Sequence, residues 1–161
     1  MNHNKANQSK IGIIAGRGAL PMHVLSKAIE KAYQVWIVGI SGFAKAQDFV
    51  GCNYLESDVG QVGRILDFFK QNDVKKLILA GKIDKPKWSA LSVDFIGSHL
   101  LARVMKNKFL GDNNILNIID NFLHEKGFEI ISGFAVLDAL DIDGAITEKI
   151  PSKEISDKNV E

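Results

Sequence analysis

Apolar residues along the chain alternate between short continuous runs and helical spacing. Runs at 11–15, 34–40 and 77–81 are rich in aliphatic and β-branched residues, which is typical of buried strands. Between these runs the apolar residues recur at helical spacing, over 20–32 and again after Gly60. The second of these helices is marked by an i, i+3, i+4, i+7 pattern of Val62, Ile65, Leu66 and Phe69. This order of strand, helix and strand predicts parallel βαβ units.

The second half of the chain continues the alternation. The pattern predicts a helix over 94–106, an amphipathic helix after Gly111 and a fourth strand over 128–131. Asp112 or Asn113 would be the N-cap of the amphipathic helix, and Gly127 would end it. Residues 41–58 show no long period and are predicted as mixed structure, anchored by three aromatic residues, Phe43, Phe49 and Tyr54. We therefore predict an α/β fold, a Rossmann-like open and mainly parallel sheet flanked by helices.

The ends of the chain carry weaker patterns. Residues 1–10 are polar and lack an apolar signal core, so we expect a disordered N-terminus there. The domain is expected to occupy 11–147, although the pattern weakens beyond Leu137. Residues 148–161 are charged and have little to bury, which is typical of a linker or tail.

Composition and charge argue against several classes of protein. The net charge is +1, with 20 basic and 19 acidic residues, which argues against a nucleic-acid binder. The single cysteine, Cys52, excludes an internal disulfide and fits a reducing compartment. No apolar run approaches the length that crosses a bilayer, so we expect a cytoplasmic protein, with peripheral membrane contact left open.

The first candidate site is the glycine turn that follows the first strand. Gly16-Arg17-Gly18-Ala19 leads into a helix with Pro21 in its first turn, and such a turn lets a ligand approach backbone N–H groups. The third glycine of a dinucleotide fingerprint is replaced by Pro21, and no acidic residue ends the second strand at 39–41. The pattern therefore disfavours a classical NAD site and favours another nucleotide or phosphate ligand, with a purely structural turn as the alternative.

The second candidate site follows the strand at 77–81. It combines lysines (Lys82, Lys85 and Lys87) with Trp88, and it leaves the sheet at the same edge as the glycine turn. The lysines could bind phosphate charge, and Trp88 could cover a base, a sugar or an acyl chain. A solvated loop with one anchoring tryptophan is the alternative.

Metal and catalytic patterns are weak. Asp138, Asp141 and Asp143 resemble a calcium loop, but its first and twelfth positions would fall on Ala139 and Ile150. The four histidines lack zinc-ligand spacing, and no nucleophile elbow is present. Catalytic residues stay unassigned, and Asp112, which also suits a helix cap, is the candidate metal ligand.

Taken together, the motifs resemble those of the LpxI-type UDP-2,3-diacylglucosamine pyrophosphatases of lipid A biosynthesis. Segment 15–21 is similar to an opening Ala-Gly-x-Gly-x-Leu-Pro, and 80–86 is similar to a second signature, Ala-Gly-x-Val-x-Arg-Pro. Segment 111–116 is similar to Gly-Asp-Asp-x-Leu-Leu, and 125–130 matches the stretch that follows. The resemblance covers nearly the whole chain after Lys10.

The resemblance implies magnesium-dependent hydrolysis of UDP-2,3-diacylglucosamine to UMP and 2,3-diacylglucosamine 1-phosphate. It also implies two domains with the lipid product between them, and a location in the cytoplasm peripheral to the inner membrane. The substrate-binding residues that this chain would supply are Gly16, Arg17, Gly18, Ala19, Lys85, Lys87, Trp88 and Ile130. The partners would be UDP-diacylglucosamine or its lipid phosphate product, and homo-oligomer formation is left open.

Departures from the family pattern change the expectation of activity. Asn113 replaces an aspartate, Asn117 stands where arginine is usual, and Lys85 replaces an arginine. The second domain, which carries the acidic residue expected to serve the metal, is missing from this chain. We therefore expect the chain to be inactive alone, as a fragment, a product of a split or decaying gene, or half of a two-chain enzyme with a separate C-terminal-domain chain. The alternatives are a non-catalytic module that binds a nucleotide or sugar phosphate, and a bare interaction scaffold.

Overall fold

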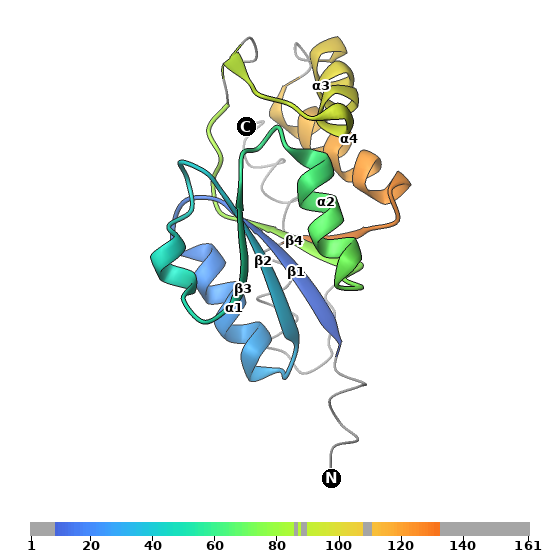
Figure 1. Cartoon of the computed structure of the whole chain (residues 1–161). Helices are drawn as coiled ribbons and strands as arrows, with labels where there is room; N and C mark the ends of the chain where they lie inside the picture. Colours follow the sequence, from blue (N-terminus) through green and yellow to red (C-terminus); the bar gives the residue numbers. More distant parts are fainter. Residues whose placement is uncertain (1–8, 86, 88–89, 108–110, 133–161) are drawn as a thin grey trace, which may run out of the picture.

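The computed structural model describes residues 9–85, 87, 90–107 and 111–132 and confirms the predicted α/β fold (Figure 1). Within these residues, five parallel strands form one sheet in the order β3-β2-β1-β4-β5. The strands are β1 (Lys10–Ala15), β2 (Gln34–Ile40), β3 (Asn53–Ser57), β4 (Lys76–Ala80) and β5 (Glu129–Ser132). The helices are α1 (Leu20–Glu30), the short 3₁₀ helix η1 (Ala46–Phe49), α2 (Val62–Gln71), α3 (Phe95–Lys106) and α4 (Asp112–Glu125).

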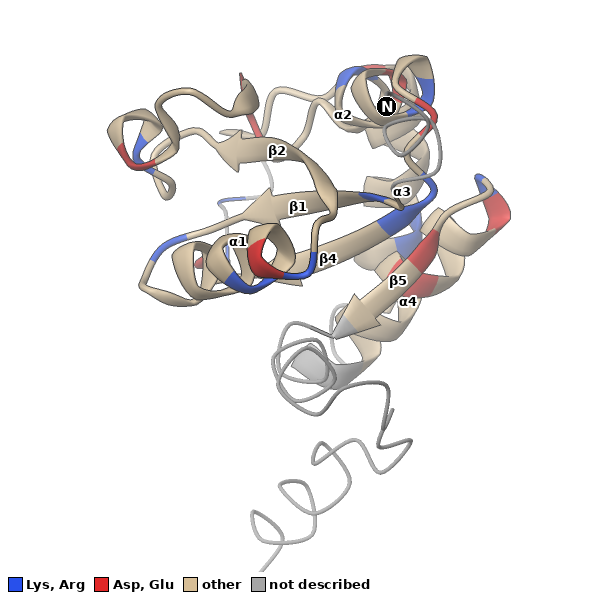
Figure 2. Cartoon of the chain, turned by 90° about the horizontal axis from the view of Figure 1, so that it is seen from below, with Lys and Arg blue, Asp and Glu red and all other residues tan. Residues whose placement is uncertain are grey.

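Two apolar clusters hold the helices on opposite faces of the sheet. Helix α1 buries Val24, Leu25 and Ala28 against one face, together with Phe49 of η1. Helices α2 and α4 pack on the other face, where Phe69 and Phe122 are almost fully buried. Figure 2 shows α1 and α2 on opposite sides of β1, with basic and acidic residues interspersed over the elements. Every strand but the edge strands is thus covered on both sides, which explains the near-continuous apolar runs.

Strand β3 corrects the prediction of mixed structure over 41–58. It pairs with β2 alone and forms one edge of the sheet. Its sequence has only two apolar residues, Tyr54 and Leu55, and they pack against opposite clusters. The alternation that marks a half-buried strand is therefore absent. The strands predicted as third and fourth are in fact β4 and β5.

The ends of α4 differ in how well the sequence predicted them. The N-cap is Gly111, with a φ of 90°, and Asp112 is the first helical residue, so the prediction of Asp112 or Asn113 as the cap was wrong. The predicted end at Gly127 is confirmed. Gly127 has a φ of 94°, its N–H donates to His124, and the Phe128 N–H donates to Leu123. These two bonds form a Schellman motif.

Helix α1 also ends in a Schellman motif, but an alanine, Ala32, takes the left-handed position where glycine is usual. Ala32 has a φ of 62°, its N–H donates to Ile29, and the Tyr33 N–H donates to Ala28. A left-handed residue with a Cβ costs about 1–2 kcal/mol. We therefore expect Ala32→Gly to raise the free energy of unfolding by about 0.5–1 kcal/mol in urea denaturation, after the added entropy of the unfolded chain. Lys31→Gly, at a φ of −87°, is the matched control and should lower stability. Equal effects at both positions would contradict the prediction.

The predictions for the two ends of the chain fall largely on residues that the structure does not describe. Residues 1–8 and the region from 133 to the end, which includes the expected tail at 148–161, lie beyond the described residues. Within the described residues, no helix combines the length and the apolar character that a membrane span requires.

Candidate functional site

The two candidate sites predicted from the sequence meet at the carboxyl ends of β1 and β4. They are the first glycine turn, at 16–19, and the segment that begins at Gly81, which we call the second glycine turn. The Gly16 N–H donates to the Ala80 carbonyl at 2.8 Å. Arg17 and Lys82 exchange both backbone bonds, at 2.8 and 2.9 Å, in an isolated antiparallel bridge. Strands β1 and β4 flank the point where the strand order reverses, which is where open α/β sheets bind ligands. The two turns therefore form one rigid edge at the expected ligand position.

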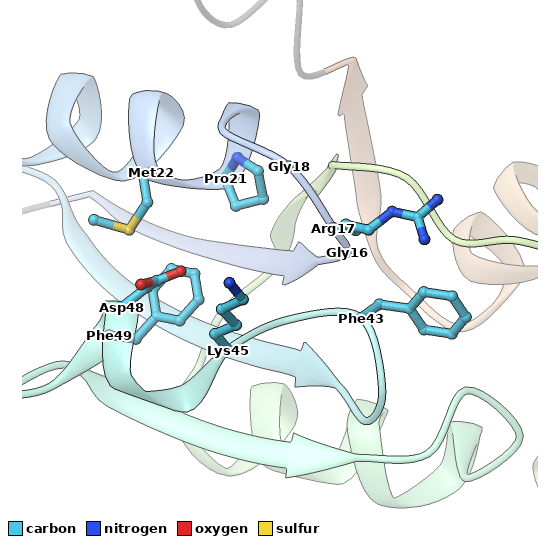
Figure 3. A pocket seen from close by; sticks show the side chains of 9 residues that line it. All are labelled: Gly16, Arg17, Gly18, Pro21, Met22, Phe43, Lys45, Asp48 and Phe49. Carbon is cyan, nitrogen blue, oxygen red and sulfur yellow. The ribbon is translucent and has the colours of Figure 1, made fainter.

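A pocket of about 320 Å³ opens on the α1 side of this edge. Figure 3 shows its walls, which come from the first glycine turn, the start of α1, and the segment between β2 and the end of η1. The lining residues are Gly16, Arg17, Gly18, Pro21, Met22, Phe43, Lys45, Asp48 and Phe49. The pocket thus combines backbone, two cations, one carboxylate and an apolar lining.

The start of α1 brings partial positive charge to the pocket. Its N-cap, Ala19, makes no side-chain capping bond, and its first turn carries no acidic residue. Gly18 has a φ of 104° and open space where a Cβ would lie. Helix N-termini without an internal acid favour anionic ligands, because their N–H groups carry partial positive charge.

Lys45 and Asp48 line the pocket and are absent from the residues predicted from the sequence. Lys45 precedes η1, and in Figure 3 its side chain rises from that segment toward the start of α1. Asp48 lies in η1, on the Met22 side of the pocket. Helix η1 has four residues, which is too short for a helical period to be recognised in the sequence. Only the proximity of this segment to the glycine turn could therefore have revealed Lys45 and Asp48.

One wall of the pocket is packed against an aromatic pair, Phe49 and Tyr54. Phe49 lines the pocket and stacks on Tyr54 of β3, with ring centroids 5.4 Å apart and planes inclined by 13°. The Tyr54 hydroxyl is buried over Gly39 and has no hydrogen-bond partner among the described residues. Burial raises the pKa of this hydroxyl, and the carboxylates of Glu56 and Asp48 raise it further. The hydroxyl therefore stays neutral at physiological pH.

Removal of that hydroxyl should stabilise the protein. A buried polar group without a partner costs about 1–3 kcal/mol, whereas the ring of phenylalanine retains the stack on Phe49. We expect Tyr54→Phe to raise the free energy of unfolding by about 1 kcal/mol, measured by urea denaturation. Tyr33→Phe, at a half-buried tyrosine of the loop before β2, provides the comparison. A loss of stability in Tyr54→Phe would mean that the hydroxyl has a partner, and the prediction would be wrong.

Of the other predicted substrate-binding residues, those that the structure describes do not line this pocket. Ala19 is the N-cap of α1 and does not line it. Lys85 and Lys87 are exposed on the segment that leaves β4, and Ile130 packs against the cluster on the α2 face. Trp88 lies outside the described residues. The structure thus brings Gly16, Arg17 and Gly18 into one pocket, and the roles of the other residues stay predictions.

The described residues do not fit a magnesium site. Among them, no three histidine, cysteine or acidic side chains come together to hold a metal ion. Asp112 is the first residue of α4, and its role as a metal ligand stays a prediction. The acidic residues at 138, 141 and 143 lie outside the described part of the chain.

Comparison with known proteins identifies related sequences. The sequence model of the family described as the LpxI N-terminal domain matches residues 10–140. A protein of Caulobacter vibrioides named UDP-2,3-diacylglucosamine pyrophosphatase LpxI is 26% identical over 130 residues, which cover 80% of this chain and 45% of that protein. The chain thus spans less than half the length of this relative.

Comparison of structures supports the fold. The enzyme WbmG of Bordetella bronchiseptica, solved with NAD and UDP, superposes with a TM-score of 0.51 at 10% identity. The match covers 81% of this chain and 38% of WbmG. At this identity the likeness shows a shared Rossmann-like fold and carries no information on the ligand.

Proposed function

Because this chain belongs to the family of LpxI N-terminal domains, we propose that it is the amino-terminal half of a UDP-2,3-diacylglucosamine pyrophosphatase. The reaction would hydrolyse the pyrophosphate of the substrate to UMP and 2,3-diacylglucosamine 1-phosphate. The observation that carries this proposal is the family match over 10–140, which includes both glycine turns. The name of the Caulobacter vibrioides relative supports the same activity.

The pocket beside α1 is the part of the substrate site that this half would supply. We assign a phosphate group to the backbone of Gly18 and the start of α1, with the Lys45 amine as its counter-charge. The apolar lining, Met22, Phe43 and Phe49, would contact the sugar or an acyl chain. In hydrolysis, such groups would stabilise negative charge as water attacks phosphorus.

The remaining parts of the machinery would come from a second half. The relative is more than twice as long as the matched region, and the described residues of this chain offer no metal-binding cluster. We propose that magnesium is held largely by that second half and that the 161-residue chain alone is inactive. We further propose a cytoplasmic location, peripheral to the inner membrane, because the substrate carries two acyl chains.

A binding experiment tests the pocket. Isothermal titration of the purified chain with UMP and with 2,3-diacylglucosamine 1-phosphate should detect binding of at least one. Lys45→Ala should weaken that binding by about tenfold, which is the loss of one charge-assisted hydrogen bond. Lys76→Ala is the matched control, because Lys76 is exposed at the opposite end of the sheet. No binding of either ligand would overturn the proposed site.

An activity experiment tests the proposal that this chain alone does not hydrolyse the substrate. Incubation of the chain with UDP-2,3-diacylglucosamine and Mg²⁺ should release no UMP above background. Release of UMP that Lys45→Ala abolishes would overturn the claim of inactivity. Binding of UMP alone, without the lipid phosphate, would instead favour a non-catalytic nucleotide-binding module.

A further inference from the structure

The side chain of Arg17 is held at the pocket rim by a residue outside the pocket. Its Nη2 atom lies 3.1 Å from Oδ1 of Asp84, which follows β4. Both side chains are about half exposed, at 53% and 51%. Asp84 does not line the pocket, whereas Arg17 does. The pair therefore links the pocket to the second glycine turn.

The backbone beneath this pair is held by hydrogen bonds, whereas the two side chains meet through one exposed contact. Both backbone groups of Arg17 bond to Lys82, so the Cα position of Arg17 cannot shift without breaking the bridge. The guanidinium, in contrast, is attached to Asp84 by one contact in solvent, and such exposed pairs contribute little to stability. In Figure 3 it lies on the Phe43 side of the pocket, apart from Lys45. A different side-chain rotamer would redirect the guanidinium without moving the sheet edge.

A phosphate group is the better partner for this guanidinium. Arginine presents five N–H donors in a fork that fits the paired oxygens of phosphate, and one carboxylate oxygen uses only part of it. A phosphate monoester, such as that of UMP or of the lipid phosphate, also carries more negative charge near pH 7 than the Asp84 carboxylate. Exchange of the Asp84 carboxylate for a phosphate would therefore give this guanidinium a better-matched partner.

We propose that Asp84 is an internal competitor for Arg17, which holds the guanidinium at the rim until a phosphate of the ligand displaces the carboxylate. This inference rests on the proposed function, because it requires that the pocket takes a phosphorylated ligand. Asp84 is a positioning residue: it acts on the ligand only through Arg17. Its effect on affinity is opposite in sign to that of a residue that contacts the ligand.

The direction in which substitution of Asp84 changes ligand affinity tests the proposal. In titrations with UMP and with inorganic pyrophosphate, Asp84→Asn should tighten binding about two- to fivefold, because the competing charge is removed. Arg17→Gln should weaken binding about tenfold. In the Arg17→Gln background, Asp84→Asn should have no further effect. Thermal unfolding of each variant should match that of the unchanged chain, since both side chains are exposed.

Three outcomes would overturn the inference, and they are distinguishable. Equal or weaker binding by Asp84→Asn, when the unchanged chain binds, would contradict the competition while the proposed function stands. Tightening that persists in the Arg17→Gln background would show a general charge effect that does not pass through Arg17. No binding of either ligand by any variant would refute the phosphate site itself, and with it this inference.

Discussion

Replacement of Asp94 with alanine is expected to lower the free energy of unfolding by about 3 kcal/mol, because one carboxylate caps two helices. Its Oδ1 accepts from the Gly97 N–H of α3 at 2.7 Å, and its Oδ2 accepts from the Arg64 N–H of α2 at 3.0 Å. Helix α2 has no capping side chain of its own, since its N-cap residue, Gln61, makes no such bond. Loss of Asp94 therefore exposes the start of both helices.

The asparagine variant separates the two caps. An amide has one acceptor oxygen, so Asp94→Asn can satisfy one helix and presents an N–H group to the other. We expect it to cost about half as much as Asp94→Ala in urea denaturation at neutral pH. Asp67→Asn, on the exposed side of α2, is the control and should change stability little. Equal stability of Asp94→Ala and the unchanged chain would refute the double cap.

The same carboxylate predicts how stability depends on pH. Partial burial alone would raise the pKa of Asp94, but the backbone hydrogen bonds from Gly97, Gly63 and Arg64 outweigh it, and the pKa is lowered. A group whose folded-state pKa is lowered contributes its full stability above the unfolded-state value, which is about 3.9 for aspartate. That contribution is lost as the pH falls through the folded-state pKa. The stability difference between the unchanged chain and Asp94→Asn should therefore shrink in acid, and a constant difference between pH 7 and pH 3 would contradict this assignment.

The sequence predicted the elements that are buried on both sides or strongly periodic. Strand β2 coincides with the predicted 34–40, and all four predicted core residues of α2 are buried. Strand β3 was missed, because an edge strand of five residues can pack Tyr54 and Leu55 on opposite faces without a visible period. The helix start at Gly111 was misjudged because Asp112 is a favourable cap by residue type, whereas the chain needs a positive φ one residue earlier.

The site was predicted in part for a similar reason. The glycine turns were recognisable because their residue types are unusual at a strand end, and their meeting followed from the parallel sheet. Lys45 and the second role of Asp94 depend on contacts between segments far apart in sequence, and the Asp94–Arg64 bond alone spans 30 residues. No local pattern encodes such contacts. Residue type and spacing therefore predict which edge of the sheet carries the pocket, and tertiary structure brings the charged side chains to it.

The bridge between the glycine turns gives the second large prediction. A Cβ at Gly81 would lie 2.8 Å from the Gly16 carbonyl carbon and 2.9 Å from the Arg17 oxygen, and the φ of Gly81 is 94°. Both neighbours are backbone atoms that the bridge to Lys82 fixes, so neither can move aside cheaply. We expect Gly81→Ala to lower the free energy of unfolding by about 3–4 kcal/mol, the sum of backbone strain and overpacking.

Two neighbouring glycines separate these contributions. At Gly16 the φ is ordinary, but a Cβ would lie 2.6 Å from the Lys82 oxygen, so Gly16→Ala should cost about 2 kcal/mol by overpacking alone. At Gly18 the φ is 104° and the space is open, so Gly18→Ala should cost about 1 kcal/mol by strain alone. Urea denaturation of the three variants should therefore rank Gly81 above Gly16 and Gly16 above Gly18. A loss at Gly81 that is no larger than the loss at Gly18 would mean that the turns are not held together, because only the backbone strain that both positions share would then act. Since Gly18 lines the pocket, Gly18→Ala should also weaken the proposed binding of UMP or the lipid phosphate while most of the stability is retained.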